Sequence, residues 1–204
     1  MAVNYPNGKK FHAESRLPKT AKKKEFIYSN RGMTLEEEIN SSNEHYLSSG
    51  KAVIHKKPTP IQVVKVDYPK RSAAVIKEAY YRQSSTTDYN GVYKGLYLDF
   101  EAKETKSKTA IPLSNFHEHQ IVHMKRCIQQ QGITFVLIRF SVFNRVFLLN
   151  SSYLIDFWEN TLNNGRKSIP LVFIEENGIE VAYGFKPRLD YLDAVDKMLE
   201  RTVK

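Results

Sequence analysis

The chain has 204 residues and is 41% hydrophobic, as expected for one globular domain with a sizeable core. No apolar run approaches the roughly 20 residues that span a membrane, no apolar signal segment opens the chain, and the single Cys127 excludes an intramolecular disulfide. We therefore expect a cytoplasmic protein whose net charge of +9 attracts a polyanion, with nucleic acid the first candidate and a membrane surface the second.

The first 31 residues are polar and basic, with KKKE at 22–25, and they predict a disordered arm over 1–31. This arm either follows a phosphate backbone or only keeps the chain soluble. Residues 32–204 are then the folded domain. Thr34 and Glu37 form a capping box for a helix that runs to about residue 49. Its predicted inner face holds Leu35, Ile39 and Tyr46.

A proline-punctuated insertion follows the short predicted strand KAVIHKK and covers about 58–85. Pro58, Pro60 and Pro69 prevent a continuous helix there. IQVVKV indicates a strand, whereas SAAVIKEAYYRQ fits a helix or a strand. Two further strands follow, at about 88–93 and 96–104, and Lys94 and Gly95 link them.

The second half of the chain alternates helices and strands. Asn115 and Glu118 predict a capping box for a helix to about residue 131. ITFVLIRF is nearly all apolar and predicts a central strand, followed by the strand RVFLLN. A helix over SSYLIDFWENTL, capped by Ser151 or Ser152, a short helix after Ser168, the strand IEVAYG and a last helix from residue 190 complete the chain. This order predicts an α/β sandwich around a mixed sheet.

The helix after residue 115 carries an apolar stripe of four side chains at helical spacing. These are Ile121, Met124, Cys127 and Ile128. The lone cysteine is interpreted as a small core residue rather than a nucleophile. His119 and His123 stand four apart on the same helix and could form a zinc pair, but a third ligand for such a pair is not identified from the sequence, so zinc is not favoured.

The strand LYLDFEAKE sends its side chains alternately to two faces. The apolar set is Leu96, Leu98, Phe100 and Ala102, and the polar set is Tyr97, Asp99, Glu101 and Lys103. The common meaning of a Glu-x-Lys pair is an exposed face with a solvated salt bridge. Asp88 shifts the balance, because on the neighbouring strand it lies close enough to join Glu101. Asp99 stands outside this group and is either solvated or paired with a lysine.

Two carboxylates brought together repel each other, and a divalent cation is the simplest remedy. Such a cation is a hard Lewis acid that suits a phosphate diester. A lysine beside it can orient the attacking water or neutralise developing charge. Asp88, Glu101 and Lys103 thus follow Asp-x12-Glu-x-Lys, which resembles the pattern of the PD-(D/E)xK nucleases. The adjacent pair Glu104 and Lys106 is rejected, because it falls where the strand gives way to the polar exit TKSKT.

Longer stretches around this triad carry a more specific signal. These stretches are SNRGMTLE, AVIHKKPTPIQVV, YPKRSAAVIKEAYYRQSSTTDYNGVYKG, DFEAKETK and FHEHQIVHMK. Together they closely resemble the RecU family, the Holliday junction resolvases of low-GC Gram-positive bacteria. The likeness runs from about residue 28 to the C-terminus and is strongest over 51–125.

The resemblance implies a restriction-endonuclease-like α/β fold, with a mixed β-sheet flanked by helices and a projecting stalk. It implies a homodimer that resolves four-way DNA junctions by paired symmetric nicks, using Mg²⁺ or Mn²⁺. Asp88 and Glu101 would hold the metal, with Thr86 and Gln120 completing the shell. Lys103 would stabilise the transition state. Glu36 would be the acid that this fold often places near the metal.

The insertion over about 58–85 is then interpreted as the stalk, with charge for phosphates and tyrosines for exposed bases. With Arg31, the expected DNA-binding residues are Lys65, Tyr68, Lys70, Arg71, Lys77, Tyr80, Tyr81 and Arg82. The alternative is a decorated hairpin loop without a ligand.

Two hypotheses of function remain from different classes. The first is a metal-dependent, structure-selective endonuclease, with a recombinase or branch-migration helicase as a further partner and no membrane partner. The second is a non-catalytic junction-binding or recombinase-regulating protein on a nuclease-like scaffold. An RNA-binding module ranks lower, since the chain has no recognisable RNA motif. The Asp-Glu-Lys triad discriminates between the two hypotheses, because a pure binder has no need for Asp88, Glu101 and Lys103 on one face.

Overall fold

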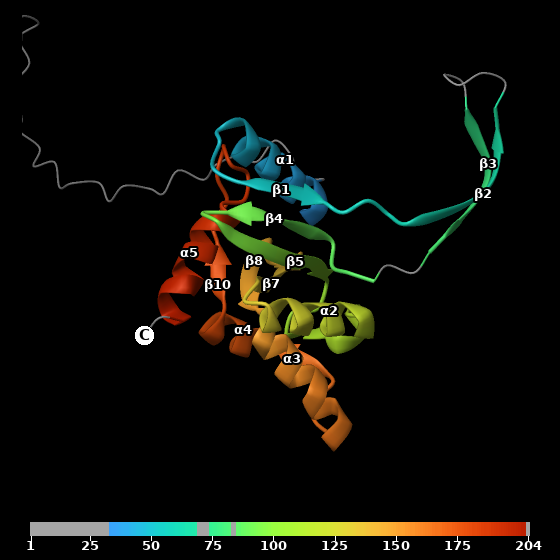
Figure 1. Ribbon diagram of the computed structural model, residues 1–204. Coiled ribbons are helices and arrows are strands. Elements are labelled where there is room, and N and C mark those ends of the chain that lie inside the picture. Colours follow the sequence, from blue (N-terminus) through green and yellow to red (C-terminus); the bar gives the residue numbers. More distant parts are fainter. Residues whose placement is uncertain (1–32, 69–73, 83–84, 203–204) are drawn as a thin grey trace, which may run out of the picture. The chain divides into compact units, whose positions relative to one another are not determined.

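The computed structural model of this chain describes residues 33–68, 74–82 and 85–202 (Figure 1). The arm expected over 1–31, with Arg31, lies outside these residues, as do Lys70 and Arg71 of the insertion. No helix in the described part of the chain has the length and apolar content needed to span a membrane.

A mixed sheet forms the centre of the domain, as predicted, and it has six strands. Its strands lie in the order β1-β4-β5-β7-β8-β10. They span Val53–Lys56 (β1), Tyr89–Tyr93 (β4), Leu96–Thr105 (β5), Ile133–Phe140 (β7), Arg145–Asn150 (β8) and Ile179–Val181 (β10). β5 and β7 are parallel, and each of the other neighbouring pairs is antiparallel.

Helices cover both faces of this sheet. The sheet therefore separates the core into two clusters, one on each face. α1 (Leu35–Ser48) and α5 (Tyr191–Thr202) contribute to one cluster, and α2 (Glu118–Gln129), α3 (Ser151–Asn160) and α4 (Leu171–Asn177) contribute to the other. β7 alternates between them: Phe135 and Leu137 join the first cluster, Val136 and Ile138 the second. Because both its faces are buried, its sequence is nearly all apolar, which confirms its predicted central position.

Several short elements complete the second cluster's side of the domain. β6 (Ala110–Pro112) pairs with β9 (Ser168–Pro170) in a small antiparallel sheet. Single 3₁₀ turns occupy Leu113–Asn115 and Thr161–Asn163. The predicted short helix after Ser168 is α4, which begins once β9 has ended.

Helix starts show where local prediction succeeded and failed. The Thr34–Glu37 capping box is confirmed, with the Glu37 amide donating to Thr34 Oγ1 at 3.2 Å and the Thr34 amide donating to Glu37 Oε2 at 2.7 Å. The box predicted at Asn115 and Glu118 is wrong. α2 instead begins after His117, whose amide donates to Gln120 Oε1 at 3.0 Å. Asn115 belongs to the preceding 3₁₀ turn, which postpones the helix.

α3 also begins differently from the prediction. Its N-cap is Asn150, whose side-chain oxygen accepts from the Ser152 amide at 2.9 Å, so neither Ser151 nor Ser152 is the cap. The apolar stripe predicted on α2 ends earlier than expected. Ile121 and Met124 are buried, but Cys127 is half-buried and Ile128 is 40% exposed.

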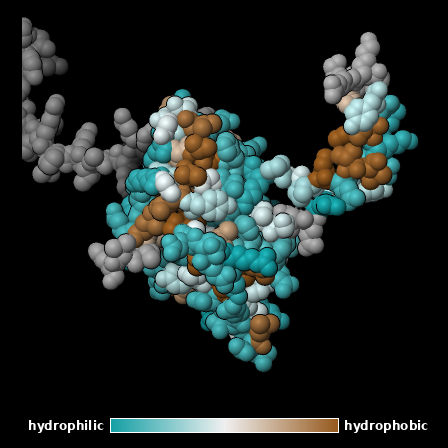
Figure 2. Space-filling model, viewed as in Figure 1, coloured by the Kyte–Doolittle hydropathy of each residue, from teal (hydrophilic) through white to brown (hydrophobic). Residues whose placement is uncertain are grey.

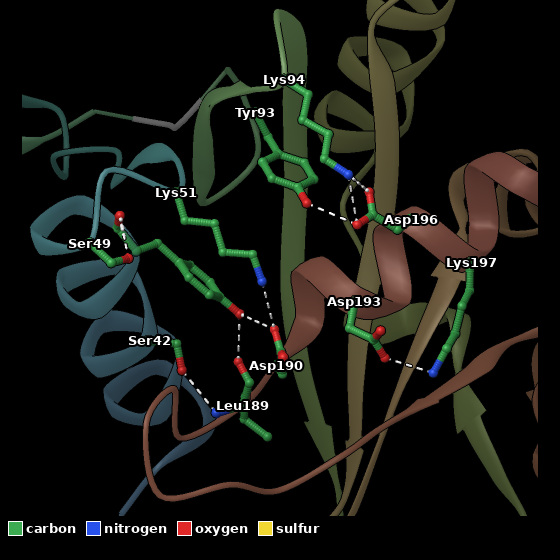
Figure 3. Close-up of polar contacts among 11 residues, drawn as sticks. Ser42, Ser49, Lys51, Tyr93, Lys94, Leu189, Asp190, Asp193, Asp196 and Lys197 are labelled. Carbon is green, nitrogen blue, oxygen red and sulfur yellow. Dashed lines mark hydrogen bonds and ion pairs between the residues drawn. The ribbon is translucent and has the colours of Figure 1, made fainter.

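The last helix is tied to α1 and to the β4–β5 turn by charged residues (Figure 3). Asp190, just before α5, accepts from the Tyr46 hydroxyl at 3.0 Å and lies 3.4 Å from Lys51 Nζ. Asp196 accepts from the Tyr93 hydroxyl and from Lys94 Nζ, each at 2.9 Å. These polar contacts supplement the apolar packing of α5 on this face of the sheet.

The β4–β5 hairpin has the two-residue turn that was predicted. Lys94 and Gly95 have φ values of 50° and 79°, so both adopt the left-handed conformation that such hairpin turns require. The turn fixes the register of the two strands and therefore decides which residue lies opposite Glu101.

The insertion is a β-hairpin, so its ambiguous second half is a strand. β2 (Ile61–Asp67) and β3 (Val75–Tyr81) pair with each other antiparallel as a separate two-stranded sheet. Nearly all their side chains are exposed. Figure 2 shows apolar side chains gathered on this hairpin, where Ile61, Val64 and Val75 are about half exposed, at 47%, 53% and 56%.

Candidate active site

Asp88 and Glu101 lie opposite each other at the start of the β4–β5 pair. Tyr89 pairs with Phe100 in the antiparallel register, which places the preceding Asp88 beside Glu101. The Asp88 amide donates to Glu101 Oε2 at 3.1 Å, and the Ala102 amide reaches Asp88 Oδ2 at 3.5 Å. The predicted proximity of the two acids is confirmed.

The polar face of β5 is not exposed. Leu98 and Phe100 join the core cluster with α1 and α5, while Asp99 and Glu101 point to the face that α2 covers, and both are 0% exposed. The alternative of a solvated salt bridge on an open face is therefore wrong. The helix layer that the strand motif could not show removes water from both carboxylates.

Burial has a large effect on the ionisation of Glu101. Desolvation, followed by the hydrogen bond and negative charge of Asp88, raises the pKa of Glu101 to about 8, although Lys103 opposes the shift. Lys103 Nζ forms a 2.7 Å ion pair with Glu101 Oε1. A buried carboxylate that faces a second carboxylate fits a hard divalent cation, which takes oxygen ligands and relieves the repulsion.

The structure places the other predicted site residues less directly. Thr86 lies two residues before Asp88, and its hydroxyl donates to the Thr87 carbonyl at 3.3 Å. Gln120 is buried, but its amide oxygen is bound to the His117 amide at the start of α2. Glu36 is exposed and forms a 2.6 Å ion pair with Lys56. Among the described residues, no hydrogen bond or ion pair joins Gln120 or Glu36 to Asp88 or Glu101.

Asp99 is the centre of a polar network that sequence reasoning missed. Its Oδ2 accepts from Lys57 Nζ at 2.7 Å and from the Tyr97 hydroxyl at 2.9 Å, and it lies 3.1 Å from His123 Nε2. Its Oδ1 accepts a short hydrogen bond from the Thr87 hydroxyl. Burial alone would raise the pKa of Asp99, but the hydrogen bonds from Lys57, Thr87 and His123 hold it below its ordinary value.

This network holds the two ends of the stalk. Lys57 is the last residue before the insertion and Thr87 follows it, and Lys57 Nζ also donates to Thr87 Oγ1 at 3.0 Å. Of the two alternatives for Asp99, the lysine pair is confirmed and the solvated acid is wrong. A signal was present in the sequence, because Asp99 shares a face with Glu101 and the two hydrogen-bonding residues flank the insertion.

Two further titratable side chains on α2 lie near charged residues of β5. His119 Nδ1 is buried without a hydrogen bond, and desolvation, followed by the charges of His117 and Lys103, lowers the pKa of His119. Cys127 Sγ lies 3.5 Å from His123 Nε2. Burial and then the charge of Asp99 raise the pKa of Cys127.

Those predicted DNA-binding residues of the stalk that the structure describes are exposed to solvent. Lys65 and Arg82 are exposed, and Arg82 Nε donates to Gln62 Oε1 at 3.2 Å. Lys77 forms a 2.6 Å ion pair with Asp67. The three tyrosines are exposed to different degrees, with Tyr68 at 71%, Tyr80 at 60% and Tyr81 at 85%.

Comparison with known proteins adds an independent observation. A family described as RecU, Recombination protein U, matches residues 30–197. The "Holliday junction resolvase RecU" of Lactiplantibacillus plantarum is 57% identical over 205 residues, covering 99% of this chain and 98% of the relative. Proteins of the same name from Geobacillus sp. (strain WCH70) and Bacillus cereus (strain AH820) are each 56% identical, covering 97% and 96% of this chain and 98% of each relative.

Proposed function

Because this chain belongs to the RecU family, we propose that it is a Holliday junction resolvase, a nuclease that cuts four-way DNA junctions during recombination and repair. The observation that carries the proposal is the buried Glu101 facing Asp88, with Lys103 at 2.7 Å. This arrangement occurs in a chain that matches its curated relatives over nearly the full length of both.

The reaction is phosphodiester hydrolysis with a divalent metal, and we infer Mg²⁺, with Mn²⁺ able to replace it. Asp88 and Glu101 would hold the ion, and Thr86 and Gln120 would complete its shell. When bound, the ion polarises the scissile phosphate and lowers the pKa of a bound water. Lys103 neutralises negative charge that develops on the phosphate. Glu36 assists from α1 once its ion pair with Lys56 opens.

The position of Lys103 suits a residue that acts on two partners in turn. Its ammonium lies over the Phe116 ring, 6.0 Å from the centroid, and the side chain is about one-fifth exposed. A partly exposed ammonium can turn from the carboxylate to an incoming phosphate, whereas the buried carboxylate cannot follow it. Lys103 would then neutralise charge on the phosphate, and Glu101 would be free to hold the metal.

The expected result with a mobile four-way junction is paired nicks that require the metal. Cleavage should appear with Mg²⁺ or Mn²⁺ and be poor with Ca²⁺, because the longer bonds and higher coordination number of Ca²⁺ displace the reacting groups. Excess EDTA should stop cleavage and leave junction binding, which the positive charge of the protein supports. The measurement is strand cleavage on a denaturing gel beside gel-shift binding. Binding without cleavage in every metal would favour the non-catalytic alternative.

We further infer that the protein acts as a homodimer, since a four-way junction offers two equivalent strands and two-fold assemblies are the commonest. A recombinase or a branch-migration helicase is a fitting further partner, because each works on the same junction. Sedimentation of the protein with a four-way junction should show two copies of the chain on each junction. A monomer under conditions in which paired nicks still form would contradict the dimer.

A further inference from the structure

Asp99, His123 and Cys127 gather three different metal-binding groups beside the triad. Asp99 comes from β5, and His123 and Cys127 stand one turn apart on α2. One ligand atom from each of the three lies within 4.8 Å of the other two. Sequence spacing alone does not combine them, since Asp99 is 24 residues from His123 in the chain.

The two separations that involve His123 match those between the ligands of a tetrahedral transition-metal ion. His123 Nε2 lies 3.1 Å from Asp99 Oδ2 and 3.5 Å from Cys127 Sγ. Zinc bonds of about 2.0–2.3 Å at tetrahedral angles place neighbouring ligand atoms roughly 3–4 Å apart. The donor set of one thiolate, one imidazole and one carboxylate suits zinc and its neighbours rather than Mg²⁺.

The cluster is accessible from a cavity. His123 and Cys127 line a cavity of about 600 Å³ at the end of α2, which Tyr97 and Gly132 also border. Asp99 is fully buried behind two of the lining residues, since it hydrogen-bonds to Tyr97 and lies 3.1 Å from His123. Three protein ligands leave the fourth position of a tetrahedral ion for water.

Lys57 is the competitor for this position. Its ammonium lies 2.7 Å from the same Asp99 oxygen that faces His123, so an incoming cation must displace it. Lys57 is only partly buried, at 17% exposed, and its long side chain can turn outward, whereas Asp99 cannot leave the core. The ammonium therefore satisfies Asp99 in the metal-free protein and weakens, without blocking, metal binding.

We propose that Asp99, His123 and Cys127 form a second metal site, separate from the Asp88–Glu101 pair, that takes Zn²⁺ or a related transition-metal ion. The site does not depend on the proposed nuclease function, because its evidence is the ligand set, the separations and the cavity.

The test is Co²⁺ titration of the purified full chain in excess Mg²⁺, which fills the hard carboxylate pair. A thiolate-to-cobalt charge-transfer band is expected, together with tetrahedral ligand-field bands, saturating at one equivalent and disappearing on addition of Zn²⁺. Cys127 is the single cysteine of the chain, so the charge-transfer band can arise only there. Cys127→Ser should abolish the band.

Three variants separate a built site from a lone thiol. His123→Gln should weaken Co²⁺ binding at least about tenfold, the smaller loss expected from damage to a metal site's surroundings. His119→Gln, one turn earlier on α2, is the control and should retain wild-type affinity. Lys57→Met should strengthen binding, because it removes the competing cation and leaves a buried carboxylate for the metal.

A wild-type protein without the band would overturn the proposal. So would a His123→Gln variant with unchanged affinity, which would mean that Cys127 binds cobalt alone. Unchanged affinity in Lys57→Met, with a cooperative melting transition, would remove Asp99 from the site.

Discussion

Glu101→Gln is expected to abolish junction cleavage and, at the same time, to raise the thermal midpoint of the metal-free protein at pH 7. The two effects have one origin, the burial of the Glu101 carboxylate. Metal binding requires this carboxylate, whereas its burial destabilises the metal-free fold. Glu101 is 0% exposed and faces Asp88, and these surroundings raise its pKa to about 8 from an ordinary value of 4.5.

The sign of the stability effect follows from proton linkage. Below pH 4.5 Glu101 is protonated in both the folded and the unfolded chain, so it causes no pH dependence there. Between 4.5 and about 8 the unfolded chain releases the proton while the folded chain retains it, so stability falls as pH rises through this window. At pH 7 the cost is on the order of a few kcal/mol, which glutamine, a neutral side chain of equal size, avoids.

The measurement is thermal unfolding without metal at pH 4 and pH 7. Each kcal/mol gained should raise the midpoint by about 2–4 °C for a domain of this size. The gain should be present at pH 7 and absent at pH 4. Cleavage should fall at least about 10²–10³-fold, because glutamine removes the charge that holds the metal.

Glu104→Gln is the matched control, since Glu104 stands on the same strand in the rejected Glu-x-Lys pair. It is exposed and contacts Arg139 and the Leu35 amide, so its replacement should leave cleavage near the wild-type rate. Asp88→Asn should also lose cleavage while retaining junction binding. Wild-type cleavage in Glu101→Gln, or a lower midpoint at pH 7, would contradict the assignment.

The Asp-Glu-Lys triad could be predicted from sequence because it depends on two local rules. Alternation along β5 places Glu101 and Lys103 on one face, and a two-residue turn fixes Asp88 opposite Glu101. The covering of that face by α2 could not be predicted, because it depends on packing between segments distant in the chain. For the same reason the burial of Asp99 and its pairing with Lys57 could not be derived from the strand alone.

Helix starts were predicted unevenly for a similar reason. Thr34 and Glu37 meet within one helical turn, so their spacing alone is informative. Asn115 has the same spacing to Glu118, but Asn115 belongs to the 3₁₀ turn over Leu113–Asn115 and so cannot be the N-cap of α2. The strand over 75–81 was ambiguous because its pattern fits two structures, and pairing with β2 decides between them.

Tyr81→Ala is expected to reduce affinity for a four-way junction much more than affinity for a duplex, if the stalk recognises the junction centre as the proposed function requires. A duplex exposes no base faces, whereas an open junction does, and stacking of one base on an aromatic ring contributes about 1–3 kcal/mol. Junction affinity should therefore fall by about 5- to 150-fold.

The structure distinguishes Tyr81 from its neighbour. Consecutive residues of a strand point to opposite faces, so Tyr80 and Tyr81 cannot stack on one base. Tyr81 is opposite Ile61 and is 85% exposed. Tyr80 is opposite Gln62, and its hydroxyl donates to Glu78 at 2.7 Å, so its ring belongs to the polar face of the hairpin. Tyr80→Ala is therefore the matched control and should have the smaller effect.

Replacing residues 66–77 with a short turn extends the test from one ring to the hairpin. The metal site should remain intact, because Asp99 holds the ends of the stalk through Lys57 and Thr87, which the deletion retains. Selectivity should collapse, with junction affinity falling toward duplex affinity.

Arg71→Ala and Lys77→Ala should weaken binding to both DNAs and flatten its salt dependence, by about one unit of slope for each phosphate that the protein no longer neutralises.

The measurement is the ratio of junction to duplex dissociation constants at fixed salt for the wild type, both tyrosine variants and the deletion. An isolated two-stranded hairpin is only marginally stable, and this one exposes Ile61, Val64 and Val75 on its surface. Contact with DNA or with a second copy of the chain would compensate for that exposure. An unchanged ratio in a deletion that still melts cooperatively would mean that junction shape is recognised by the six-stranded domain rather than by the stalk.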